Sequence, residues 1–127
     1  MESSPSIGKL FAHIHYVRLV FVSEDAPEVM WPMPNADDEW LGVQDRERMA
    51  ELLTESAVAV RDAVRARLEA GRQMELHYDH PILLLQHMIW HEGYHHGQIK
   101  LTLKLAGRPL ANKDIGPLTW RVWMNKQ

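Results

Sequence analysis

Apolar residues recur at helical spacing along three long stretches of the chain, and no stretch alternates as a β-strand would. The first stretch, residues 6–22, is apolar on nearly every side, as in a helix that is covered from two directions. The second, residues 45–70, carries arginine and glutamate between its apolar positions and stops at Gly71, a residue type common just after a helix. The third, residues 81–106, has Pro81 in its first turn, where proline is favoured. The pattern predicts an all-α protein with three long helices.

Two further segments connect or follow these helices. Residues 24–44 contain three prolines and several acidic residues, which predicts a long irregular connection that Trp31 and Trp40 hold against the body. Residues 110–127 show little helical periodicity and are rich in tryptophan, and we expect them to form a packing tail. A chain of 127 residues is just long enough to close one core, so we expect a single domain over residues 1–127.

Composition narrows the classes of function. The chain is 46% hydrophobic and 24% charged, as is usual for a soluble globular protein, and its net charge of −3 gives no support to a nucleic-acid partner. The absence of cysteine excludes disulfides, thiolate nucleophiles and zinc-cysteine sites. The N-terminus lacks the features of a signal peptide and no apolar run reaches membrane-spanning length, so we expect a cytoplasmic protein without a membrane partner.

Histidines on the third stretch carry the candidate chemistry. His91 and His95 are four residues apart, which on a helix stacks both imidazoles on one face, within reach of one metal ion. At 100° per residue the same face also carries Leu84 and Met88, so it is expected to point inward. His87 lies one turn earlier and extends the row of histidines.

The first stretch offers a third ligand. His13 borders its apolar stripe, whereas His15 lies roughly opposite and is expected to be packed or to lie at a dimer surface. Because three helices are too few to cover a helix that is apolar on nearly every side, we expect a second copy of the chain to supply the missing cover.

Residues 91–95 also satisfy H-E-x-x-H, the zincin pattern, in which two histidines bind zinc and Glu92 acts as general base. A zincin takes its third ligand from downstream, and beyond His96 this chain has no histidine and no glutamate. There is also no sheet to align a peptide substrate. A zincin-type hydrolase is therefore the less favoured interpretation.

A longer pattern fits better. The segment His91-Glu92-x-x-His95-His96-Gly97-Gln98, together with Ser6-Ile7-Gly8-Lys9-Leu10-Phe11-Ala12-His13, resembles the DinB-like (DinB/YfiT) family of helical metal-binding proteins. In that family a histidine of the earlier helix joins an H-x-x-x-H pair to make a three-histidine site. The resemblance implies an up-down bundle with His13, His91 and His95 as ligands of a divalent ion, and with His87 and Gln98 beside them. Zn²⁺ or Ni²⁺ is expected first, with Fe²⁺ or Mn²⁺ as alternatives.

The chain departs from the family in two places. His96 stands where the family usually has arginine, so whether it points outward or joins the site stays open. The family usually begins with another long helix that completes a four-helix bundle, whereas this chain starts almost directly at the histidine helix. We therefore expect a homodimer in which the partner copy replaces that helix.

Relatives in this family include transferases and an isomerase that use a low-molecular-weight bacterial thiol. The resemblance thus implies a metal-dependent thiol S-transferase or related detoxification enzyme, in which either Glu92 or a nucleophile activated by the metal does the chemistry. The alternative is a non-catalytic metal-binding or stress-related helical dimer. Four arginines of the second helix region could bind a carboxylate or phosphate but are expected to form its solvated face: Arg61, Arg65, Arg67 and Arg72.

Overall fold

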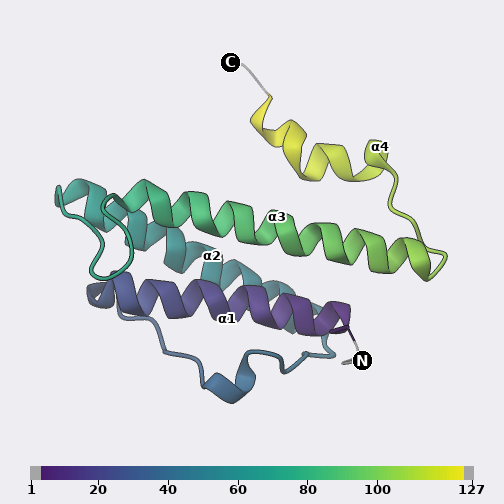
Figure 1. The fold of residues 1–127 in the computed structure, drawn as a ribbon, viewed down its shortest axis with the longest axis horizontal. Helices are drawn as coiled ribbons and strands as arrows, with labels where there is room; N and C mark the ends of the chain where they lie inside the picture. Colours follow the sequence, from purple (N-terminus) through teal and green to yellow (C-terminus); the bar gives the residue numbers. More distant parts are fainter. Residues whose placement is uncertain (1–3, 125–127) are drawn as a thin grey trace. The chain divides into compact units, whose positions relative to one another are not determined.

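The computed structural model describes residues 4–124, and all regular structure in that range is helical. Three long helices carry the fold: α1 (Ile7–Asp25), α2 (Arg46–Glu69) and α3 (Pro81–Leu105) (Figure 1). The predicted all-α class is confirmed, and the bounds of α2 and α3 lie within one residue of those expected. Only α1 differs, because it continues past residue 22 to Asp25.

The helix ends follow from local chemistry. Ser6 caps α1, its hydroxyl accepting a hydrogen bond from the Lys9 amide at 3.3 Å. Asp45 caps α2 in the same way: its carboxylate accepts hydrogen bonds from the backbone amides of Glu47 at 2.9 Å and Arg48 at 3.1 Å. Gly71, beyond the end of α2, has a φ of 60°, a left-handed conformation that glycine adopts without steric cost.

The helices do not simply alternate in direction. In Figure 1, α1 and α2 run the same way, and α3 as far as His95 runs back against both. The connection of residues 26–45 returns the chain along α1, with short 3₁₀ turns at Pro27–Val29 and Ala36–Asp38. Both tryptophans of this connection hold it in place as expected, since Trp31 packs against the core and Trp40 stacks on the ring of His13.

The chain divides into two compact units, with the boundary between His95 and His96. The second unit contains the end of α3, α4 (Asn112–Ile115) and 3₁₀ turns at Gly116–Leu118 and Trp120–Trp123. The tail is thus made of short helical turns, and residues 125–127 of the predicted tail lie outside the described range. Its packing, and the single domain expected over the whole chain, stay predictions.

The core of the first unit lies where α1, α2 and the beginning of α3 meet. Ala59 and Ala63 of α2 are completely buried. Leu84 and Met88 of α3 are also buried, which confirms the inward face deduced from spacing. The buried cluster consists of Leu19, Val22, Ala26, Ala59, Val60, Ala63, Val64, Met74, Leu84 and Met88. None of the helices in the described part of the chain is long and apolar enough to cross a membrane.

A row of uncovered apolar side chains lies on α3, and not on α1 as the sequence suggested. Every residue of α1 from Leu10 to Asp25 is at least partly buried, because α2, α3 and the connection cover the helix on different sides. On α3, by contrast, Trp90 and Tyr94 are 65% and 55% exposed and stack on each other with centroids 5.8 Å apart. Ile82, Leu83 and Ile89 of the same helix are exposed as well. Exposed apolar rows of this kind often mark protein contacts.

The homodimer expected from the sequence is therefore best tested on α3. We predict that light scattering at micromolar concentration gives twice the mass of one chain. The double substitution Trp90→Glu, Tyr94→Glu should give a single-chain mass, since a carboxylate in an apolar contact loses its hydration. Leu76→Glu, at an exposed apolar residue outside α3, is the matched control and should leave the mass unchanged. A single-chain mass for the unaltered protein would contradict the prediction.

Candidate metal centre

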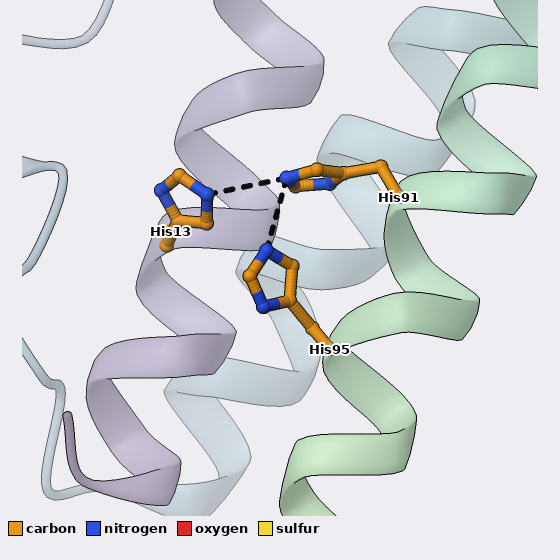
Figure 2. A group of neighbouring side chains, drawn as sticks. All are labelled: His13, His91 and His95. Carbon is orange, nitrogen blue, oxygen red and sulfur yellow. Dashed lines mark hydrogen bonds between the residues drawn. The ribbon is translucent and has the colours of Figure 1, made fainter. Parts of the chain in front are cut away.

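Three histidine side chains from α1 and α3 converge on one point (Figure 2). His91 Nε2 lies 3.1 Å from His13 Nε2 and 3.1 Å from His95 Nε2. The ligand atoms of all three lie within 4.8 Å of one another. His91 and His95 come from successive turns of α3, and His13 faces them from α1. The structure thus brings together the three residues that the sequence selected.

The donor set fits a divalent ion. Zinc binds imidazole nitrogen at about 2.0–2.1 Å, which in a tetrahedral site puts neighbouring nitrogens about 3.3 Å apart. The observed separations of 3.1 Å are close to that value. The cluster supplies three donors, so a tetrahedral ion held here would keep its fourth position open to another ligand. The three-histidine cluster could therefore bind a divalent metal.

Burial keeps the histidines in the form that binds metals. It lowers the pKa of His91 to about 4, with further lowering from the neighbouring His95 and His13. Burial also lowers the pKa of His13, against the opposing effect of Glu39. Metal binding requires neutral imidazole, so neither ring has to lose a proton near neutral pH before it can act as a ligand.

Glu39 and Trp40 are site residues that the histidine pattern did not reveal. Glu39 Oε1 lies 2.8 Å from His13 Nδ1, the ring nitrogen that faces away from the cluster. The Trp40 ring stacks on the His13 ring with centroids 4.1 Å apart and planes 5° apart. Both residues lie in the irregular connection, where periodicity gives no information; the only signal was the expectation that Trp40 anchors this segment.

His87 lies beside the cluster and outside it. Its ring centroid is 6.4 Å from that of His91, and its Nδ1 lies 2.7 Å from the hydroxyl of Tyr78. The sequence had placed His87 near the ligands but had not identified Tyr78 as its partner. Gln98 and His96 belong to the second unit, and the roles considered for them stay predictions.

Glu92 is held by an arginine. Its Oε1 accepts from Nε of Arg18 at 2.9 Å and lies 2.7 Å from Nη2 of the same guanidinium. Arg18 is only 9% exposed, and its Nη1 donates to the carbonyl of Leu53 and to the hydroxyl of Ser56, both on α2. The guanidinium therefore joins all three helices, and Glu92 serves to position α3.

A groove runs beside this ion pair. Its volume is about 570 Å³, and it is lined mainly by apolar side chains of α2 and α3, with Arg18 and Glu92 among its polar residues. This volume is within the range of small-molecule sites. Arg61 and Arg65 also line it, which singles them out from the other arginines of the region.

Arg67 corrects the expectation of a solvated arginine face. It is 1% exposed, its Nε and Nη2 lie 2.7 and 2.8 Å from the carboxylate of Glu28, and its Nη1 donates to the carbonyl of Gln73 at 2.7 Å. Glu75 lies 3.3 Å from the same guanidinium. Spacing on α2 could not show this, because all of these partners lie in connections that fold back onto the helix. Arg67 thus holds connections in place, and Arg72 lies 3.6 Å from Glu75 at the surface.

The helical fold and the inward histidines define a helical protein with a candidate three-histidine metal centre. The model of the DinB family matches residues 1–121, which is nearly the whole chain. The chain therefore belongs to the DinB family. Comparison with curated proteins and with solved structures gave no match.

The role of Arg18 can be tested by stability. Arg18→Leu leaves Glu92 and Ser56 without their buried partner, and it should lower the free energy of unfolding by about 2 kcal/mol. The loss stays below that of a fully buried pair because Glu92 is 37% exposed. Urea unfolding followed by circular dichroism measures it. Glu92→Gln, which retains a hydrogen-bond acceptor, should cost less; a loss for Arg18→Leu below about 0.5 kcal/mol would show that the pair does not stabilise the bundle.

Proposed function

We propose that this DinB-family protein binds one divalent metal ion through Nε2 of His13, His91 and His95. The observation that carries the proposal is the convergence of three ring nitrogens from two helices, at separations close to those of a metal site. The lowered pKa values of His13 and His91 support it, because they leave the lone pairs of these rings available at neutral pH. Zn²⁺ and Ni²⁺ both suit imidazole ligands.

We further propose that the protein is a metal-dependent thiol S-transferase. A divalent ion on three neutral imidazoles keeps its full positive charge and would lower the pKa of a thiol that binds at its open position. In such a transfer the thiol sulfur forms a bond to an electrophilic carbon, the leaving group departs with its electron pair, and the thiol proton passes to solvent. The chain's own residues hold the ligands neutral and exclude water around them.

The groove beside Arg18 and Glu92 is lined by none of the three histidines, so we assign it no part in the transfer. The pairing of Glu92 with Arg18 favours this reaction over zincin-type hydrolysis, which needs Glu92 as a free base.

Metal binding is the first test. The purified protein should bind close to one equivalent of Zn²⁺ or Ni²⁺ per chain, and His91→Ala should weaken binding at least tenfold, since it removes the central ligand of the three. His80→Ala is the matched control, because His80 is exposed before α3 and outside the cluster. Calorimetric titration and metal analysis after dialysis measure the effect, and circular dichroism checks the fold. Unchanged metal content in His91→Ala would refute the site assignment.

Turnover is the second test. The metal-loaded protein should accelerate transfer of a small thiol to a chromogenic aryl halide, measured over a panel of thiols, and both the metal-free protein and His91→Ala should lose the acceleration. Loss in both is expected because the thiol then has no cation to lower its pKa. Full metal loading with no acceleration for any thiol would favour the non-catalytic metal-binding alternative.

A further inference from the structure

The connection between α1 and α2 holds the ring of His13 from two sides. Glu39 contacts the ring edge at Nδ1, 2.8 Å away, and Trp40 covers the ring face with nearly parallel planes. The two residues are adjacent in sequence, so one short segment makes both contacts. The side chain of His13 is 13% exposed and that of Glu39 is 32% exposed. The contacts therefore lie at the edge of the site, between the cluster and solvent.

The contact with Glu39 determines which nitrogen of His13 can bind a metal. Neutral imidazole carries one N–H, and a carboxylate can only accept a hydrogen bond. With Glu39 at Nδ1, the favoured tautomer has its proton on Nδ1 and its lone pair on Nε2. Nε2 is the atom that faces His91 at 3.1 Å. The stacked Trp40 opposes rotation of the ring, which keeps Nε2 directed at His91.

His91 lacks a carboxylate of this kind. The Nδ1 atoms of His13 and His91 are both buried, and within the described residues neither makes a hydrogen bond of good geometry, but that of His13 has the Glu39 carboxylate 2.8 Å away. No side chain of the described range therefore fixes the tautomer of His91. Its Nε2 can instead donate to the lone pair that Glu39 leaves on His13 Nε2, at 3.1 Å. The positions of the protons in the cluster are thus determined first by the contact of Glu39 with His13 and then by the contact of His13 with His91.

We propose that Glu39 is a positioning residue that fixes His13 as the Nδ1–H tautomer and so prepares the metal centre before an ion binds. The proposal rests on the proposed function in one respect, since the metal is the ligand that this preparation serves. Carboxylates that accept from the second nitrogen of a metal-binding histidine typically raise metal affinity ten- to a hundredfold. The connection thereby contributes to the site without supplying a ligand.

Ring nitrogen NMR of the metal-free protein tests the proposal directly. With ¹⁵N-labelled histidine, the spectrum of the unaltered protein should show His13 with its proton on Nδ1. Glu39→Ala should shift the population toward the Nε2–H tautomer or average the two, whereas Glu39→Gln should retain part of the preference through its amide oxygen. Asp37→Ala is the matched control: it removes the same charge from the same turn, at an exposed residue, and should change nothing.

Metal affinity gives the second readout. Glu39→Ala should weaken Zn²⁺ binding by about 10- to 100-fold, with Glu39→Gln between it and the unaltered protein. An unchanged His13 tautomer in Glu39→Ala, or a Zn²⁺ affinity equal to that of Asp37→Ala, would overturn the proposal. The two failures can be told apart. If the unaltered protein binds no metal, the proposed function fails, but the tautomer measurement still decides the role of Glu39.

Discussion

The buried guanidinium of Arg18 is the interaction on which the rest of the structure depends. It projects from α1, donates to a carbonyl and a hydroxyl of α2, and pairs with Glu92 of α3. Because Glu92 directly follows His91, the ion pair fixes where α3 lies along α1 and how it is turned about its axis. Removing a charge from water is costly unless all its donors are used, so other placements of α3 are disfavoured. The meeting of His91 and His95 with His13 follows from that placement.

The direction of the helices explains why the connection belongs to the site. Since α1 and α2 run the same way, the chain must return along α1 before α2 can begin (Figure 1). That return carries Glu39 and Trp40 past His13, which lies in the first half of α1. A short turn between antiparallel helices would have left Nδ1 of His13 without a carboxylate. The parallel direction of α1 and α2 thus brings a carboxylate to the candidate metal centre.

Sequence reasoning succeeded where a single helix contains the information. The bounds of α2 and α3 follow from caps and stops, and the i, i+4 spacing of His91 and His95, with the apolar residues on their face, predicts their inward direction. It did not reveal that α1 and α2 are parallel, because periodicity does not depend on direction. The sequence could not identify Glu39 as a site residue, because the irregular connection has no periodicity from which its position beside α1 could be deduced. The burial of Arg67 was not predicted for the same reason, because its partners Glu28 and Gln73 lie in irregular connections.

The histidine cluster is better suited to a cation than to packing. Each contact between two Nε2 atoms needs one proton and one lone pair, and His91 Nε2 makes two such contacts at 3.1 Å. If Glu39 holds the proton of His13 on Nδ1, as we propose, His91 supplies the proton of its contact with His13 and has no lone pair to accept one from His95. Protonation of His91 is opposed by burial, which lowers its pKa to about 4. A divalent ion would satisfy all three lone pairs at once, and no arrangement of protons does so.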